Sequence, residues 1–298
     1  MRIAIVGAGR MGKWFAKFFL EQGLTVIASD KDYEKLRKIK EELSVEIADN
    51  VKAVKSADRI FVCVPIDHFE DAIKEISTHI RPGQEVMDIC SVKETPVNIM
   101  HKYISNAVTL GTHPMFGPGA KSIKGQNFIL TPTNVKEQAL AKDFREWLES
   151  KGANVFFMTP QEHDRIMSIV LGLPYFLSYV VCDVLLSCRK FGKTKKVSGI
   201  SYKLLLTLME AVLSERIEFA ENILMNLPEV DKLGELLLEK NKEWLGMIRR
   251  KNGITLINKM MLLKSKLAKM DPQYFGAYEY MYEMLNAIGK EKKNERTR

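Results

Sequence analysis

Cysteine is scarce in this chain. Only four cysteines occur among 298 residues, and their spacing matches no metal-binding pattern. Two of them, Cys63 and Cys90, lie in apolar runs, where cysteine behaves as a small hydrophobic residue. The sequence therefore argues against a disulfide scaffold and a zinc module, and we expect no metal site.

The sequence also shows no signal peptide, internal repeat or low-complexity stretch outside its last residues. A strand-like run begins at residue 2, with no apolar leader before it. Together with the few cysteines, this indicates a protein of the reducing cytoplasm. A chain of 298 residues exceeds one ordinary hydrophobic core, so we expect two domains.

Positive charge is in excess, but it is not concentrated in a nucleic-acid-binding pattern. The formal net charge is +8, and residues 290–298 contribute five basic and two acidic groups to it. Elsewhere the charges mostly alternate in sign along helical stretches, which is typical of solvated helix faces. We therefore expect a basic tail on a soluble enzyme and no nucleic acid partner.

One long apolar run stands out at residues 166–188, which is long enough to span a bilayer. It contains Pro174 and Asp183 and follows a charged stretch. A helix that is apolar on all sides is either membrane-spanning or buried in a large core. We favour a helix buried between two subunits, which predicts a homodimer and no membrane contact.

The first half alternates between strand-like and helical patterns, which predicts a mostly parallel sheet covered by helices. A helical pattern at residues 11–22, for example, places four aromatic residues on one face. The strand-like runs lie at residues 3–6, 25–29, 45–48, 59–64, 85–89, 108–111, 128–130 and 154–158.

The pattern changes after residue 158. Thr159, Pro160 and Glu162 form a helix start, with a capping residue, a proline in the first turn and the acidic partner of a capping box. Only amphipathic helices are indicated beyond it. We therefore predict an α/β Rossmann domain at residues 1–158, followed by an all-α domain for substrate binding and dimerisation at residues 159–298.

A dinucleotide-binding motif opens the first domain. Gly7, Gly9 and Gly12 form the pattern G-x-G-x-x-G between a strand and a helix, with Arg10 and Met11 inside it. The first glycine permits a tight turn, the second lets the backbone approach a pyrophosphate, and the third lets the helix lie close to the strand. The helix N-terminus then faces the phosphates.

The second strand and the fourth complete this predicted site. Asp30 ends the second strand, where a carboxylate can accept hydrogen bonds from both ribose hydroxyls and would repel a 2′-phosphate. This position favours NAD over NADP, although Lys31 follows it directly. Val64 and Pro65, after the fourth strand, are expected to line the adenosine side.

Two polar side chains follow neighbouring strands at the edge where such sheets bind ligands. Ser91 comes after the strand at 85–89, and His113 comes after the strand at 108–111. The following Pro114 biases His113 toward an extended backbone. A histidine beside a nicotinamide is suited to accept a hydroxyl proton as a hydride leaves. A purely structural role for this histidine is the other interpretation.

The run HPMFGP at residues 113–118, with Ser91-Val92-Lys93 before it and Glu162-His163-Asp164 after it, resembles the prephenate/arogenate dehydrogenase family. The resemblance covers nearly the whole chain. It implies NAD-dependent oxidative decarboxylation of prephenate to 4-hydroxyphenylpyruvate, or of arogenate to tyrosine, in tyrosine biosynthesis. It also implies that His113 accepts the ring hydroxyl proton and that Ser91 bonds to that hydroxyl and to the histidine.

The substrate side departs from the family's pattern. Where the family commonly has an arginine that binds a substrate carboxylate, this chain has Lys203. We expect Lys203, His163 and Lys93 to contribute to substrate binding, with Arg165 or Arg216 as other candidates for the carboxylate. A locally hydrogen-bonded His163 is an equal possibility at this stage.

Two other functions remain open from the sequence. One is a two-domain reductase of the hydroxyacid or imine type, which also joins a Rossmann domain to a helical dimerisation domain. The other is a non-catalytic NAD-binding regulator, which would have no need of Ser91 and His113 together. Prephenate and arogenate differ only in a keto or amino side chain, and the sequence does not distinguish them.

Overall fold

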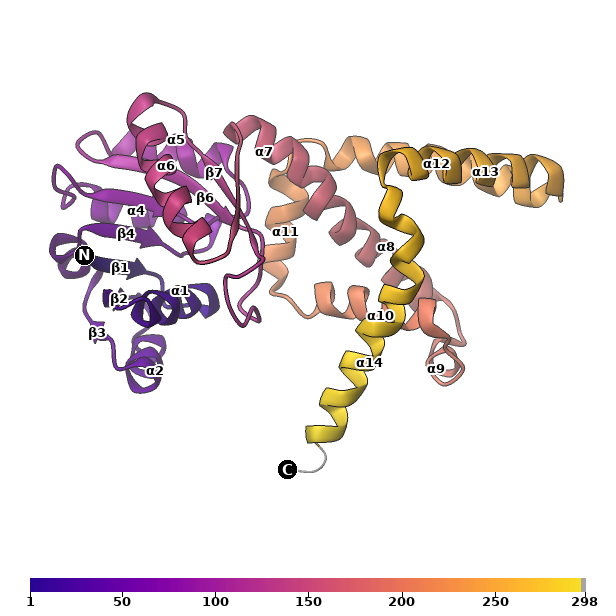
Figure 1. Cartoon of the computed structure of the whole chain (residues 1–298), viewed down its shortest axis with the longest axis horizontal. Coiled ribbons are helices and arrows are strands. Elements are labelled where there is room, and N and C mark those ends of the chain that lie inside the picture. Colours follow the sequence, from indigo (N-terminus) through magenta and orange to yellow (C-terminus); the bar gives the residue numbers. More distant parts are fainter. Residues whose placement is uncertain (296–298) are drawn as a thin grey trace. The chain divides into compact units, whose positions relative to one another are not determined.

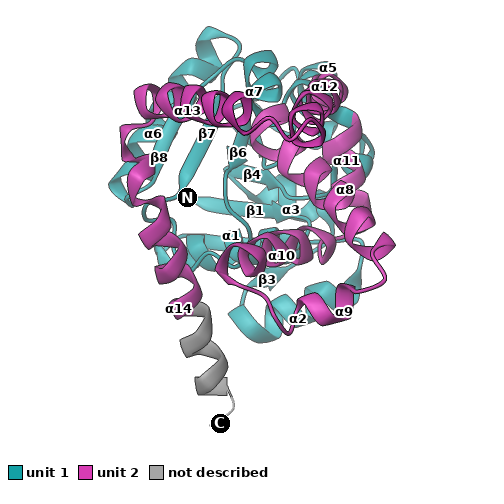
Figure 2. Cartoon of the chain, turned by 90° about the vertical axis from the view of Figure 1, so that its right-hand side faces the viewer, with its two compact units in different colours: residues 1–167, 226–228 teal, residues 168–225, 229–298 magenta. Residues whose placement is uncertain are grey.

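The computed structural model describes residues 1–295, and side chains as far as residue 287. The basic tail predicted at residues 290–298 lies outside the described side chains. The chain divides into two compact units (Figure 2). One comprises Met1–Met167 and Asn226–Pro228, and the other comprises Ser168–Met225 and Glu229–Arg298.

The first unit is built on one eight-stranded sheet with the order β3-β2-β1-β4-β5-β6-β7-β8 (Figure 1). All neighbouring strands are parallel except β6 and β7, which are antiparallel. The predicted mostly parallel α/β sheet is confirmed. The strands are β1 (Arg2–Val6), β2 (Thr25–Ser29), β3 (Glu46–Ile47), β4 (Arg59–Val62), β5 (Glu85–Asp88), β6 (Val108–Pro114), β7 (Asn127–Thr131) and β8 (Asn154–Phe157).

Helices cover both faces of the sheet because alternate residues of each buried strand point to opposite sides. Ile3 and Ile5 of β1 pack with α1, α2 and α6, whereas Ala4 and Val6 pack with α3, α4 and α5. The helices of this unit are α1 (Arg10–Glu21), α2 (Tyr33–Leu43), α3 (Asn50–Ser56), α4 (Phe69–Ser77), α5 (Glu94–Tyr103), α6 (Val135–Ser150), α7 (Pro160–Met167) and the 3-10 turn η1 (Ile66–His68).

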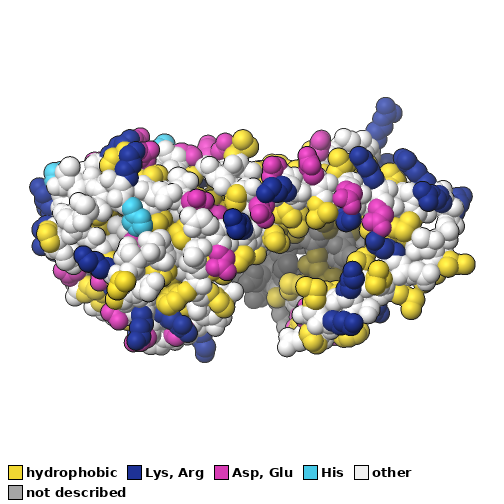
Figure 3. Space-filling view, turned by 90° about the horizontal axis from the view of Figure 1, so that it is seen from above, with side chains coloured by type: hydrophobic (Ala, Val, Ile, Leu, Met, Phe, Trp, Pro, Cys, Tyr) yellow, Lys and Arg dark blue, Asp and Glu magenta, His cyan; other side chains and the backbone are white. Residues whose placement is uncertain are grey.

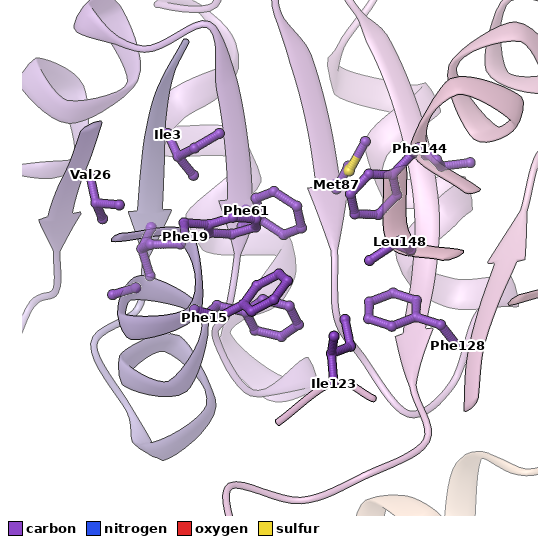
Figure 4. Close-up of a cluster of buried hydrophobic side chains, with 14 of the residues drawn as sticks. Ile3, Phe15, Phe19, Val26, Phe61, Met87, Ile123, Phe128, Phe144 and Leu148 are labelled. Atoms are coloured by element: carbon purple, nitrogen blue, oxygen red, sulfur yellow. The ribbon is translucent and has the colours of Figure 1, made fainter. Parts of the chain in front are cut away.

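Aromatic rings fill the core under α1 and α6 (Figure 4). Phe15 of α1 stacks on Phe61 of β4, with ring centroids 5.6 Å apart. Phe128 of β7 meets Phe144 of α6 edge to face at 6.1 Å. Rings at such spacing bury large apolar areas, so they fix α1 and the turn before it against the sheet.

Strand β6 is longer than the sequence pattern suggested. It extends to Pro114 because its second half pairs antiparallel with β7, and His113 lies opposite Ile129. His113 was expected in a loop after the strand, and the structure corrects this: the histidine belongs to the strand itself. Its backbone is therefore fixed by sheet pairing.

The helix after β8 begins as the capping pattern predicted. Thr159 Oγ1 accepts a hydrogen bond from the Glu162 backbone N–H at 3.1 Å. The predicted domain boundary at residue 158 differs from the division after Met167, because α7 groups with the sheet unit. The cause is visible in Asp164, whose carboxylate binds backbone N–H groups at the start of α5.

In the second unit, the described residues form helices only. The apolar run at 166–188 is not one regular helix: a π-helical segment, η2 (Ser168–Gly172), precedes α8, and Pro174 stands at the start of α8. Proline cannot donate to the preceding turn and its ring crowds the carbonyl four residues earlier. The other helices are α8 (Leu173–Ser187), α9 (Phe191–Thr194), α10 (Ile200–Leu213), α11 (Ile217–Asn226), α12 (Val230–Arg249), α13 (Gly253–Met270), η3 (Pro272–Gly276) and α14 (Ala277–Glu295).

Candidate active site

The glycine motif forms a tight turn between β1 and α1. Gly7 has φ +103°, and a Cβ added there would lie 2.7 Å from the carbonyl oxygen of Cys63. A Cβ on Gly12 would lie 1.9 Å from the carbonyl oxygen of Gly7. Neither position accepts a side chain, so the turn and the close approach of α1 both depend on glycine.

Gly9 is different, because a Cβ there would meet no atom within 4 Å. It is the N-cap of α1, and no side chain caps this helix end. The open space therefore lies at a helix N-terminus, which is where a pyrophosphate binds. The residues present fit the diphosphate of a dinucleotide, with Arg10 and Met11 as the first residues of the helix.

Asp30 stands directly after β2 and reaches back to the same turn. Its Oδ2 accepts the Ala8 backbone N–H at 2.7 Å, and its Oδ1 accepts the Asp32 backbone N–H at 2.8 Å. Each oxygen keeps capacity for a further hydrogen bond. Val64 also borders the turn, since its Cγ1 lies 3.0 Å from a Cβ placed on Gly7, and the exposed Pro65 follows it.

A buried ion pair links the ends of β5 and β6. Lys93 and Asp88 are both fully buried, and the Lys93 ammonium binds the Asp88 carboxylate. The same ammonium donates to the Thr112 carbonyl oxygen at 2.5 Å, and Asp88 accepts the Cys90 backbone N–H at 2.8 Å. The Lys93 ammonium is thus buried against these protein groups, and the predicted role of Lys93 in substrate binding stays a prediction.

His113 belongs to a line of three hydrogen-bonded side chains. Its Nδ1 lies 2.8 Å from Nε2 of His163, and Nδ1 of His163 lies 2.7 Å from Oδ1 of Asp164. His163 has no exposed surface, and His113 keeps 4%. His163 was also expected to contact substrate, but both of its ring nitrogens are engaged by protein side chains in the described part of the chain.

The surroundings favour the neutral form of both imidazoles. Burial lowers the pKa of His113 well below its usual value, and the nearby His163 and the Lys93 ammonium lower it further. Burial also lowers the pKa of His163, although the Asp164 carboxylate opposes that shift. A neutral His113 has one ring nitrogen with a free lone pair, which is the state that a general base requires.

Ser91 lies in the bend after β5 and is partly exposed. Within the described residues, its hydroxyl makes no hydrogen bond to His113, whose Nδ1 is bonded to His163 instead. The predicted bond between Ser91 and the histidine is thus not formed in this structure. The predicted bond from Ser91 to a substrate hydroxyl stays a prediction.

Lys203 lies in the second unit, on the first turn of α10, and its side chain is exposed. Its ammonium has no ion-pair partner among the residues whose side chains are described. Arg216, one of the other candidates, pairs with Glu218 at 3.3 Å. The role of Lys203 toward a substrate carboxylate stays a prediction.

Sequence reasoning assigned no role to Asp88 and Asp164. A signal existed for each: Asp88 follows the apolar Val86 and Met87 in a strand, and Asp164 directly follows His163 in the Glu162-His163-Asp164 run. Buried carboxylates are rare unless they are paired, so both were candidates for an internal partner. Their partners lie up to 71 residues away in sequence.

A glycine turn that fits a diphosphate, an acidic residue after β2 and a buried histidine on β6 are features of a dinucleotide-binding protein of the Rossmann class. Residues 15–157 match the family model described as "Prephenate dehydrogenase, nucleotide-binding domain". The nucleotide-binding half of the chain is therefore similar to that domain of the prephenate/arogenate dehydrogenases, as the motifs indicated.

Several proteins named prephenate or arogenate dehydrogenase are similar to this chain over a longer stretch than the family model. The chain is 32% identical over 257 residues to the probable arogenate/prephenate dehydrogenase of Methanocaldococcus jannaschii, covering 85% of this chain but only 58% of that protein. The fold of the present chain is similar to that of prephenate dehydrogenase from A. aeolicus in complex with hydroxyphenyl propionate and NAD+. The TM-score is 0.76 at 24% identity, and the match covers 91% of this chain and 98% of the other. Synechocystis arogenate dehydrogenase gives a TM-score of 0.73 at 19% identity, covering 91% of this chain and all of the other.

Proposed function

We propose that the chain is an NAD-dependent dehydrogenase of the cytoplasm that oxidatively decarboxylates prephenate to 4-hydroxyphenylpyruvate in tyrosine biosynthesis. The observation that carries the proposal is the buried His113 within the HPMFGP run, hydrogen-bonded through His163 to Asp164. The dinucleotide turn in the same unit supports it. Arogenate is the second candidate substrate.

The proposed chemistry needs one base and one hydride acceptor. NAD, when bound at the Gly7–Gly12 turn, would accept the hydride from the ring carbon that bears the hydroxyl. His113 takes the proton of that hydroxyl, so that a carbonyl can form. The bond to the ring carboxylate then breaks, carbon dioxide leaves, and its electron pair completes the aromatic ring. Aromatisation makes the overall reaction strongly favourable.

Substrate binding requires cations, because prephenate carries two carboxylates. We infer that Lys203 binds one of them and that Ser91 donates to or accepts from the ring hydroxyl. Arg165, exposed on α7, is another candidate for a carboxylate. A single ammonium gives a charge-assisted contact without the two parallel bonds of an arginine.

We also propose that the second unit pairs with a second copy of the chain. Many large apolar side chains are exposed on it: α13 has no buried residue, and α8 buries only Ser178. Figure 3 shows hydrophobic side chains among the charged groups on one face of the molecule. Apolar surface of this extent is typical of an interface.

A membrane is the other possible partner. Among the described residues, one helical stretch, Pro160–Ser187, is long and apolar enough to cross a bilayer, and 11% of its most apolar window is buried. Its apolar part is interrupted by the π-helical segment η2 and by Pro174. Asp183 also lies within it, so a second copy is the better match.

The test is an assay with purified protein and NAD, in which NADH formation is followed with prephenate and with arogenate in separate reactions. We expect turnover with prephenate, and a higher kcat/KM for it than for arogenate. The reverse preference would make arogenate the substrate. NAD binding without turnover of either compound would favour the non-catalytic regulator, and turnover of a hydroxyacid or imine would favour the other reductase class.

A further inference from the structure

Asp164 is placed to act on both residues assigned to catalysis. Its Oδ1 accepts the Lys93 backbone N–H at 2.7 Å, and its Oδ2 accepts the Glu94 backbone N–H at 2.9 Å. These two N–H groups open α5, which begins just after Ser91. The same Oδ1 also lies 2.7 Å from Nδ1 of His163. One buried carboxylate thus joins the Ser91 turn to the histidine pair.

The carboxylate determines which nitrogen of His163 carries the proton. A carboxylate with several N–H donors is an acceptor only, so His163 Nδ1 must be the donor to Asp164. In a neutral ring the other nitrogen, Nε2, is then an acceptor. His113 Nδ1 therefore donates to His163 Nε2, and the free lone pair of His113 lies on Nε2.

The opposite assignment is unfavourable. If His113 carried its proton on Nε2, its Nδ1 would need a donor, and a neutral His163 would have to donate from Nε2. The lone pair on His163 Nδ1 would then face the Asp164 carboxylate at 2.7 Å. Two acceptors at that distance in a buried site repel each other, and both lose a hydrogen bond.

We propose that Asp164 and His163 are positioning residues. They hold His113 in the tautomer protonated on Nδ1, so that its Nε2 is the base. The Asp164 carboxylate also fixes the turn that carries Ser91. This inference rests on the proposed role of His113 as the base. When His113 accepts the substrate proton, the new positive charge is stabilised through His163 by the Asp164 carboxylate. The charged groups around the pair are Asp164 on α7, Lys93 in the turn before α5, and Asp88 on β5.

The first experiment reads the tautomers directly. In protein labelled with ¹⁵N-histidine, two-bond ¹⁵N–¹H correlations separate the Nδ1–H from the Nε2–H form, and the chain has only five histidines. His113→Asn and His163→Gln assign the two signals. We expect both rings to be Nδ1–H in the wild type. A wild-type His113 in the Nε2–H form would overturn the proposal.

The second experiment uses two variants that each keep one of the two bonds of His163. In His163→Gln the amide reaches the former Nε2 position and can accept from His113. In His163→Asn the amide reaches only the former Nδ1 position and can bind Asp164 alone. We expect His163→Gln to keep kcat within about tenfold of the wild type. We expect His163→Asn to lose about 10- to 100-fold, the range typical when a group that orients a functional ligand is removed.

Asp164→Asn completes the set, and Glu162→Gln, an exposed neighbour on α7, is the matched control. We expect Asp164→Asn to lower kcat about 10- to 100-fold at an unchanged KM for NAD, and to convert part of His113 to the Nε2–H form. Urea unfolding of each variant separates these effects from a loss of fold. If kcat is equal in His163→Gln and His163→Asn, or higher in His163→Asn, His163 is a structural residue only.

The outcomes separate this inference from the proposed function. If the wild type turns over neither prephenate nor arogenate, the proposed function fails, while the tautomer measurement still decides the role of Asp164 and His163. If the wild type is active and the tautomers or the variant order differ from those expected, the positioning role fails and the proposed function stands.

Discussion

At the scale of single residues, His113 is the side chain on which the proposed chemistry depends. His113→Asn keeps a polar group of similar size but removes the nitrogen that accepts the proton. We expect kcat to fall about 10²- to 10⁴-fold, the usual cost of losing a general base. The dissociation constant for NAD, measured by fluorescence or calorimetry, should stay the same. A variant within a few-fold of wild-type turnover would contradict the base role.

The pH dependence follows from the low pKa of His113. The base form is the neutral ring, so kcat/KM should rise with pH through the pKa of the free enzyme and then reach a plateau. Because burial, His163 and Lys93 lower the pKa of His113 well below its usual value, the rise should lie below pH about 6.5. A midpoint above that value in the measured profile would show that the ring is more easily protonated than its burial implies.

Cofactor choice is assigned to Asp30. Asp30→Ser removes the carboxylate that we propose binds the ribose and that accepts the Ala8 backbone N–H. We expect a higher KM for NAD and a smaller preference against NADP, because the repulsion of a 2′-phosphate is lost. Asp32→Ser is the control, since Asp32 caps α2 through the Glu34 N–H and has no contact with the glycine turn in the described structure. Equal wild-type efficiency with both cofactors would remove this assignment.

Substrate recognition is assigned to Lys203. Lys203→Ala should raise the KM for prephenate about 10- to 100-fold, since a charge-assisted hydrogen bond contributes about 1.5–3 kcal/mol. The KM for NAD should barely change, and Lys203→Arg should keep or improve substrate binding. Lys196→Ala, an exposed lysine of the same unit, is the control. An unchanged KM for prephenate would direct the search to Arg165 and Arg216.

At the scale of elements, the ion pair between Asp88 and Lys93 joins the turn after β5 to the end of β6. Lys93→Met leaves the Asp88 carboxylate buried without its cation, which typically costs about 3–5 kcal/mol. We expect a clear decrease in the free energy of unfolding by urea. Lys74→Met, which breaks an exposed pair with Glu70, should change stability little. A Lys93→Met protein that keeps its stability but has a raised KM for prephenate would support the predicted role of Lys93 in substrate binding.

The elements also show which sequence signals were sufficient. The glycine turn, β1, α1 and β2 were predicted closely because a turn that excludes side chains and a strand buried on both faces leave local marks in the sequence. The extent of β6 was not predicted, because its last residues form a strand only through pairing with β7. The sequence also did not predict that α7 and α8 are separate helices. The continuous apolar pattern gave no sign of the π-helical segment that precedes Pro174.

At the scale of the whole molecule, the apolar surface of the second unit predicts self-association. We expect a dimer in sedimentation at micromolar concentration. Val184→Glu and Met261→Glu, which place charges on exposed positions of α8 and α13, should shift the protein toward monomer. Val135→Glu, at an exposed apolar position of α6, is the control and should leave the dimer intact. A wild-type monomer, or partition of the protein into detergent micelles, would count against the interface.

The sequence by itself determined the Rossmann half, its dinucleotide turn and the two strands, β5 and β6, that place Ser91 and His113. These features are encoded over short stretches, by Gly7 and Gly12, which leave no room for a side chain, and by hydrophobic runs of fixed period. The tertiary structure alone decided how His113 is supported. His113 and His163 are 50 residues apart, Lys93 and Asp164 are 71 apart, and no periodic pattern connects them. Such partners become visible only when packing excludes water and each buried polar group must find another.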